Sequence, residues 1–257
     1  MIRLSPLKAL IPVTILLASC AAPTLPPAPT ATQTPSPAPT ATLIPTATLP
    51  VTATAIPGFE DWTVNNPQAV DIAYETNALV LTLKHRALWF MSQRGVLFSK
   101  PVSGDFKITA DVYTAKSSNP SRPPGGNGSV QLGGLMARNG NGGRENYVFI
   151  VVGDDGNGLS VETKTTLNSE STYEGPAWNA ADAALRLCRF GQTFNLYKRH
   201  IGAAESWQLA AAFERPDLPD SLQVGINIYS DNEPDLQIRY ENLTIEPISS
   251  DADCETD

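Results

Sequence analysis

The sequence is poor in histidine and cysteine, with two histidines and three cysteines among 257 residues. Zinc sites need several of these ligands at short spacings, and no such spacing occurs, so we expect no metal site and no other cofactor. No Gly-x-Ser-x-Gly turn is present to carry a hydrolase nucleophile. The glycine-rich stretch at residues 140–143 links two expected strands and opens no phosphate-binding helix. These absences predict a chain without catalytic residues of the familiar types.

Basic residues are also scarce. Lys and Arg total 18 against 26 Asp and Glu, which gives a formal net charge of −8. Nucleic acid is therefore not an expected partner, because binding to phosphates requires clustered cations that release counterions. The same charge balance disfavours attraction to anionic lipid headgroups. Any link to a membrane has to come from a covalent lipid and not from the charge of the folded domain.

Residues 1–19 have the features of a lipoprotein signal peptide. Two basic residues precede an apolar run at 9–17 that is too short to span a bilayer as a mature helix. The run leads into Leu17-Ala18-Ser19-Cys20, which resembles the lipobox of bacterial lipoproteins and implies that Cys20 is lipidated and becomes the new N-terminus. An ordinary signal peptide with a chance cysteine is the alternative. We expect an exported chain, lipid-anchored to the cell membrane, with its domain on the extracellular side.

Residues 20–57 lack the composition of a folded domain. Apart from Cys20 they are mostly Pro, Thr, Ala and Ser, and no charged residue occurs between Lys8 and Glu60. Ten prolines remove backbone donors and favour extended polyproline II geometry. The segment therefore predicts a disordered, semi-rigid stalk, and its Pro-Thr and Ala-Thr pairs leave O-linked glycosylation open.

Residues 58–248 show the alternating pattern of one all-β domain. Short runs of alternating apolar residues are separated by Gly, Asn, Asp and Pro, which is typical of antiparallel strands joined by turns. Residues 153–158 and 191–193 predict tight turns, since Gly and Asn tolerate positive φ, and the Asp and Asn of the first lack the spacing of a calcium loop. The expected strands are 78–83, 106–113, 130–138, 147–152, 159–166, 184–190, 194–199, 222–229 and 236–245.

Five motifs recur in order along these runs: Leu88-Trp89-Phe90, Gly104-Asp105-Phe106-Lys107-Ile108, Gly134-Leu135-Met136-Ala137-Arg138, Leu185-Arg186-Leu187-Cys188-Arg189-Phe190-Gly191 and Val224-Gly225. With these motifs the chain resembles the concanavalin A-like lectin/glucanase superfamily, in particular its bacterial laminin-G-like branch. The resemblance covers nearly all of residues 59–247. It implies an antiparallel two-sheet jelly-roll sandwich whose sheets stack through their apolar faces.

The catalytic signature of the glucanases in this superfamily is missing. Those enzymes carry two glutamates and an aspartate alternating on one strand, so that acid and nucleophile share a face. The nearest match is Glu170 and Glu174 with Thr172 between them, which we interpret as solvated loop or rim residues. The sequence thus favours binding over catalysis.

Sugar binding relies on aromatic faces and planar polar groups, and five residues are candidates. For Trp89 and Tyr147 the alternative is core or edge packing, whereas Trp178 lies in a loop-like stretch. Alternation sets Arg138 and Arg186 away from the leucine-rich core, where structural ion pairs are the alternative. We expect a surface-displayed, non-catalytic module that binds carbohydrate or a glycosylated partner. A glycoside-active enzyme of unrecognised type and a structural or protein-adhesion domain are the alternatives.

Cys188 and Cys254 are the cysteines left over once Cys20 is assigned to lipid. An exported protein can keep a disulfide between them. Cys254, however, lies in an acidic tail, residues 249–257, that we expect to be mobile. We therefore predict a free, partly buried thiol at Cys188.

Overall fold

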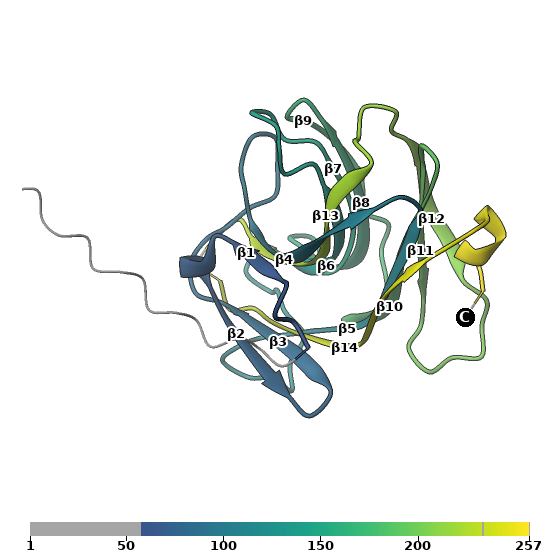
Figure 1. Cartoon of the computed structure of the whole chain (residues 1–257). Helices are drawn as coiled ribbons and strands as arrows, with labels where there is room; N and C mark the ends of the chain where they lie inside the picture. The colour runs from purple at the N-terminus through teal and green to yellow at the C-terminus, as the bar shows by residue number, and fades with distance from the viewer. Residues whose placement is uncertain (1–57, 233, 257) are drawn as a thin grey trace, which may run out of the picture. The chain divides into compact units, whose positions relative to one another are not determined.

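The computed structural model describes residues 58–232 and 234–256. Cys20, the signal segment and the stalk lie outside the described residues. The described part folds into two seven-stranded antiparallel sheets that stack as a sandwich (Figure 1). The predicted all-β, two-sheet architecture is confirmed. Among the described residues, no helix has the length and apolar character needed to cross a membrane.

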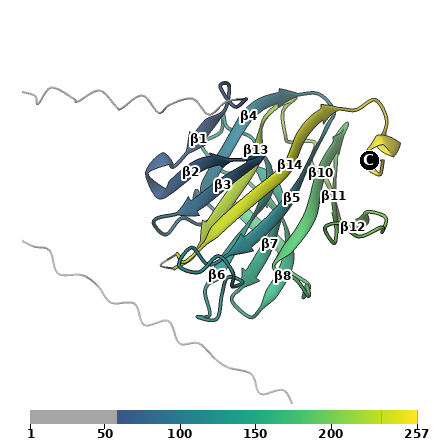
Figure 2. The ribbon, with the colours of Figure 1, turned by 90° about the horizontal axis from the view of Figure 1, so that it is seen from below.

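The two sheets are called sheet 1 and sheet 2. Sheet 1 has the order β1-β4-β13-β6-β7-β8-β9, with bounds Thr63–Asn65, Val96–Ser103, Ser221–Ser230, Val130–Arg138, Tyr147–Asp155, Leu159–Leu167 and Glu170–Glu174. Sheet 2 has the order β12-β11-β10-β5-β14-β3-β2, with bounds Gln208–Glu214, Thr193–Arg199, Asp182–Phe190, Phe106–Ala115, Gln237–Pro247, Ala78–Leu83 and Val70–Glu75. Figure 2 shows sheet 2, with β2 and β3 on one side and β11 and β12 on the other.

The main core lies between the sheets and follows from the period of two along each strand. In β5, Phe106, Ile108, Ala110 and Val112 are buried and belong to this core. Strand β13 contributes its even-numbered apolar residues in the same way. Alternating side chains point to opposite faces of a sheet, so each strand needs an apolar residue at only every second position.

A second apolar cluster covers the outer face of sheet 1, the face turned away from sheet 2. The covering segment, residues 84–95, joins β3 to β4 and lays Trp89 on that face beside Met136, Tyr147 and Phe149. The Trp89 indole N–H donates to the carbonyl of Val96 at 3.1 Å. Both faces of the central strands of sheet 1 are therefore buried.

The predicted turns are confirmed, and five strands were not predicted. The Asp155 N–H donates to the Gly158 carbonyl at 3.0 Å and closes the β7–β8 hairpin. The missed strands β1, β2, β9 and β12 include both edges of each sheet, where apolar alternation is weak. Strand β4 was missed although it is internal, and it contains Pro101, which has no backbone N–H. Strand β1 pairs only with residues 97–99 of β4, so the side of β4 that faces β1 needs no donor at Pro101.

The prediction of a mobile tail and a free thiol is wrong. Cys188 and Cys254 form a buried disulfide with their Cα atoms 5.7 Å apart. The tail forms a short 3-10 helix, η2 (Asp251–Cys254), that begins in a capping box at Ser250. The Lys107 ammonium donates to the carbonyls of Asp253 and Thr256. An acidic tail is held because cations of sheet 2 bind its backbone oxygens.

Candidate functional site

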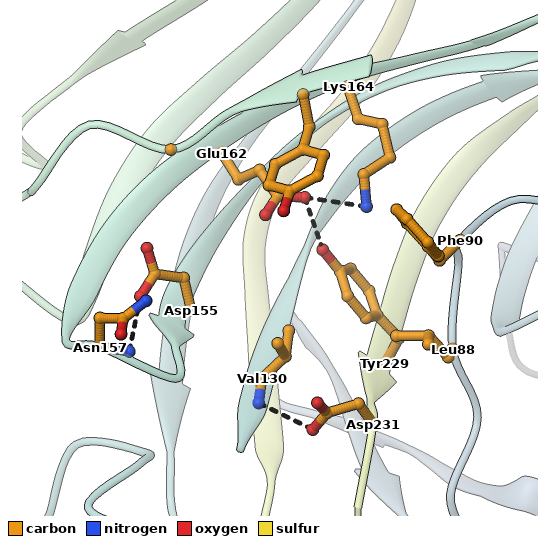
Figure 3. A pocket seen from close by; sticks show the side chains of 11 residues that line it. Leu88, Phe90, Val130, Asp155, Asn157, Glu162, Lys164, Tyr229 and Asp231 are labelled. Atoms are coloured by element: carbon orange, nitrogen blue, oxygen red, sulfur yellow. Dashed lines mark hydrogen bonds and ion pairs between the residues drawn. The ribbon is translucent and has the colours of Figure 1, made fainter. Parts of the chain in front are cut away.

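A pocket of about 320 Å³ opens on the outer face of sheet 1, next to the β7–β8 turn (Figure 3). Its walls come from five parts of the chain: the covering segment, the start of β6, the β7–β8 hairpin, β9 with the residue after it, and the end of β13. The lining residues are Leu88, Phe90, Val130, Asp155, Asn157, Glu162, Lys164, Tyr173, Gly175, Tyr229 and Asp231.

Strand β8 supplies the charged side chains at the base of the pocket. Its sequence alternates, so Ser160, Glu162 and Lys164 share the outer face while Val161 joins the main core. Register then fixes the neighbours of Lys164, which pairs with Phe149 on β7 and with Tyr173 on β9. The lysine is therefore flanked by an aromatic residue on each adjacent strand.

Lys164 is buried and fully engaged by neighbouring groups. Its Nζ lies 3.0 Å from Glu162 Oε1 and donates to the Trp89 carbonyl at 3.1 Å. Four aromatic rings surround it, with Nζ between 4.8 and 5.6 Å from the centroids of Phe149, Tyr173, Phe90 and Tyr229. Such cation–π contacts are strongest where water is excluded, so the cage compensates part of the cost of burying the charge.

Glu162 joins Lys164 to Tyr229. The Tyr229 hydroxyl donates to Glu162 Oε1 at 3.0 Å, and Figure 3 shows the carboxylate between the two partners. Burial, followed by the charge of Glu162, raises the pKa of Tyr229 well above its usual value. Burial lowers the pKa of Lys164, although the carboxylate of Glu162 opposes that shift. The base of the pocket is a paired ionic cluster of lysine, glutamate and tyrosine.

The mouth of the pocket is polar with one exposed aromatic ring. Tyr173 is 55% exposed and meets Phe90 edge-on, with ring centroids 6.2 Å apart. Asp155 and Asp231 each use Oδ1 to accept a backbone N–H, from Asn157 at 2.8 Å and from Val130 at 2.9 Å. Figure 3 places these two carboxylates on separate walls. The mouth can therefore offer a ring face together with carboxylate and amide groups.

Arg138 lies on the same outer face but outside this pocket. It is 2% exposed, and its Nε and Nη2 donate to the two carboxylate oxygens of Glu145 at 2.7 and 2.9 Å. Its Nη1 donates to Gln223 Oε1 at 2.7 Å, and Glu145 also accepts from Arg94. Burial would raise the pKa of Glu145, but the hydrogen bonds and charges of Arg138 and Arg94 outweigh it and lower the pKa.

Trp89 and Tyr147 are also on this face, and both are fully buried. Their rings meet edge-on with centroids 5.5 Å apart, and Tyr147 stacks on Phe149. Burial raises the pKa of Tyr147 to about 12. Both rings hold the covering segment on the sheet, and neither is available to a ligand in this conformation.

Arg186 and Trp178 lie away from the pocket. Arg186 is on β10 in sheet 2, where its Nη1 donates to the carbonyls of Cys254 and Thr256 and its guanidinium lies 4.1 Å from the centroid of the Trp207 ring. The half-buried Trp178 stacks on His200 at 4.2 Å. Arg138 and Arg186 thus lie on the outer faces of different sheets. The sequence did not predict this separation, because alternation tells which side of a strand a residue takes but not to which sheet the strand belongs.

The residues of the pocket were not selected from the sequence. One signal was available: Ser160, Glu162 and Lys164 alternate within a predicted strand. The contributions of Phe90, Tyr173 and Tyr229 depend on strand order and had no local signal. Glu170 and Glu174 are exposed, as predicted, but they lie on edge strand β9 and not in a loop. Within the described ranges, no group of three His, Cys, Asp or Glu side chains is arranged as a metal site.

The two stacked seven-stranded antiparallel sheets have the concanavalin A-like fold that the resemblance in the sequence implied. No protein-family model and no curated protein sequence matches the chain. Among solved structures, a functionally unknown protein from Saccharomyces cerevisiae aligns with a TM-score of 0.59 and 15% identity, over 75% of this chain and 99% of its own.

Two larger bacterial proteins are also similar. The GH43 protein BlXynB from Bacillus licheniformis aligns with a TM-score of 0.53 and 11% identity over 74% of this chain. A xylan β-1,4-xylosidase from Bacillus halodurans C-125 aligns with a TM-score of 0.52 and 12% identity over 71% of this chain. The matched regions are 37% and 35% of those two proteins. At identities this low, the structural similarity establishes a shared fold and nothing further. The function therefore has to be argued from the site.

Proposed function

We propose that this chain is a lipid-anchored, surface-displayed module that binds carbohydrate in the pocket of sheet 1 without cleaving it. The observation that carries the proposal is the exposed ring of Tyr173 at a pocket that also presents polar side chains. Sugars present one face of C–H groups and an edge of hydroxyls. A ring that is 55% exposed can stack on the first, while the carboxylate of Asp155 and the amide of Asn157 can bind the second.

Non-catalytic binding is favoured over glycoside hydrolysis by the surroundings of Glu162. A general acid of a glycosidase lies in an apolar or acidic environment. Glu162 instead faces an ammonium group at 3.0 Å and accepts a hydrogen bond from Tyr229. Its contacts are therefore those of a paired side chain at the base of a binding pocket.

Export is supported by the disulfide between Cys188 and Cys254, since such bonds persist in oxidising compartments. Anchoring through Cys20 rests on its sequence context alone. A sugar-binding domain held at the membrane surface would keep its ligand near the cell. We assign this role to the anchor.

A glycan array with the purified chain, followed by calorimetry on the best ligand, tests the proposal. Tyr173→Ala should weaken binding by about 1–2 kcal/mol, roughly fivefold to thirtyfold, because the stacking surface is lost. Stability should fall only modestly, because the ring is 55% exposed and three other rings remain beside Lys164. Tyr74→Ala is the matched control, because Tyr74 is 47% exposed on β2 and does not line the pocket. An empty array, or equal affinities for wild type and Tyr173→Ala, would contradict the proposal.

A further inference from the structure

The pocket carries more carboxylates than cations. Asp155, Glu162 and Asp231 line it with a single ammonium group, that of Lys164. When all four are ionised, the lining has two negative charges in excess. A uronic acid or another anionic sugar would therefore be repelled at close range, in walls that are partly shielded from solvent.

Lys164 does not provide a site for an anion. One carboxylate and one carbonyl oxygen already accept hydrogen bonds from its ammonium group, and four aromatic rings enclose it. Its side chain is 4% exposed, so a ligand carboxylate has little access to it. The charge that a ligand meets is therefore that of the two aspartates.

Both aspartates keep an acceptor for a ligand. The Oδ1 atoms of Asp155 and Asp231 accept backbone N–H groups. Neither Oδ2 atom has a hydrogen-bond partner among residues 58–232 and 234–256. A carboxylate with one oxygen fixed by the backbone is oriented, and its second oxygen can accept a charge-assisted hydrogen bond at little further cost in side-chain entropy.

Gly175 leaves an open space beside Asp155. A Cβ atom at this position would lie 3.6 Å from Asp155 Oδ2 and 3.8 Å from both Ser160 Oγ and Glu162 Cβ. The Ser160 hydroxyl is 1% exposed and has no hydrogen-bond partner within the described part of the chain. A buried hydroxyl without a partner is costly, and a ligand donor in this space would satisfy it.

We propose that the pocket selects sugars that carry a free amino group, such as de-N-acetylated hexosamine units, over neutral and acidic sugars. This inference rests on the proposed function. The sugar ring stacks on Tyr173, and its ammonium group donates to Asp155 Oδ2 and to Ser160 in the space that Gly175 leaves open. An ammonium group has three donors and a positive charge, which is the chemistry that an oriented carboxylate and an unpaired hydroxyl recognise.

A matched pair of ligands isolates the amino group. A β-1,4-linked glucosamine tetramer and cellotetraose share their linkage and differ at C2, where one has an ammonium group and the other a hydroxyl. By calorimetry at about pH 6, where the amine is protonated, the glucosamine tetramer should bind at least about fivefold more tightly. The difference should shrink in about 0.5 M salt. A β-1,4-linked uronic acid tetramer should bind more weakly than cellotetraose.

Two variants test whether the preference for the glucosamine tetramer arises at this pocket. Asp155→Asn should remove most of the preference, because the affinity for the glucosamine tetramer should fall by a clearly larger factor than the affinity for cellotetraose. Gly175→Ala adds a methyl group at ordinary contact distances, so the protein should fold normally and lose affinity for the glucosamine tetramer. Glu170→Gln is the control, because Glu170 is an exposed acid on β9 outside the pocket lining and should leave every affinity unchanged.

The failure of this inference can be separated from failure of the proposed function. Equal affinities for the glucosamine tetramer and cellotetraose would overturn the preference while sugar binding stands. The same conclusion follows if the array returns only other glycans and the glucosamine tetramer does not bind. A preference that survives intact in Asp155→Asn would also overturn the inference. If no glycan binds, both statements fail.

Discussion

Buried charged side chains on the outer face of sheet 1 lie in two separate groups. Lys164, Glu162 and Tyr229 form the base of the pocket, whereas Arg138, Arg94 and Glu145 secure the covering segment near β6. Removing one partner of a buried pair leaves the other charge uncompensated, which costs more than the pair contributes as a whole. Both groups should therefore contribute to stability, whereas only the first lines the pocket and should also affect binding.

Replacing Arg138 with Ala should lower the free energy of unfolding by about 3 kcal/mol, because Glu145 would lose its bidentate partner in a buried place. Sugar affinity of the folded protein should be unchanged, since Arg138 does not line the pocket. Denaturant unfolding and calorimetry measure the two quantities. Arg144→Ala, at an exposed neighbouring position, is the control and should affect neither. A stable Arg138→Ala protein with weakened binding would instead identify Arg138 as a ligand contact.

At the scale of elements, the C-terminal η2 is attached to sheet 2 at several points. The disulfide joins Cys254 to β10, and Arg186 and Lys107 donate to backbone carbonyls of the tail. The Asn195 side chain also bonds to Asp251 at 3.1 Å. These contacts cover the part of the outer face of sheet 2 that β5, β10 and β11 form. The pocket lies on the outer face of the other sheet.

The double variant Cys188→Ser, Cys254→Ser should lower the free energy of unfolding by about 4 kcal/mol, because the bridge closes a loop of 66 residues and restricts the unfolded chain. Sugar binding should persist, since the pocket is on the opposite sheet. Chemical denaturation of the oxidised wild type and the variant measures the difference. Wild type treated with reductant should match the variant, and a variant as stable as the oxidised protein would contradict this account.

At the scale of the whole molecule, anchoring is proposed to depend on one atom, the Cys20 thiol. Cys20→Ser should abolish incorporation of radioactive fatty acid in cells, because the acceptor is removed while the rest of the signal remains. Ser19→Ala keeps a small residue before the cysteine and should retain the label. Cys20→Ser should therefore leave a precursor that carries no lipid. Equal labelling of Cys20→Ser and wild type would refute the anchor.

Local patterns in the sequence determined nine of the fourteen strands and both tight turns. Alternating apolar residues predicted β3 and β6 with the bounds observed, and Gly and Asn predicted the hairpin between β7 and β8. These features depend on neighbouring residues, since side-chain direction has a period of two and positive φ is tolerated by few residue types. The same local alternation set Glu162 and Lys164 on one face of β8.

Tertiary structure decided the pocket and the disulfide. The rings around Lys164 come from residues 90, 149, 173 and 229, and strand order and register bring them together. Cys188 meets Cys254 because β14 carries the chain end back across sheet 2. A local pattern carries no information about contacts between residues far apart in the sequence. The sequence by itself determined to which face of a strand each side chain points, whereas the neighbours of each side chain were set by pairing between distant strands.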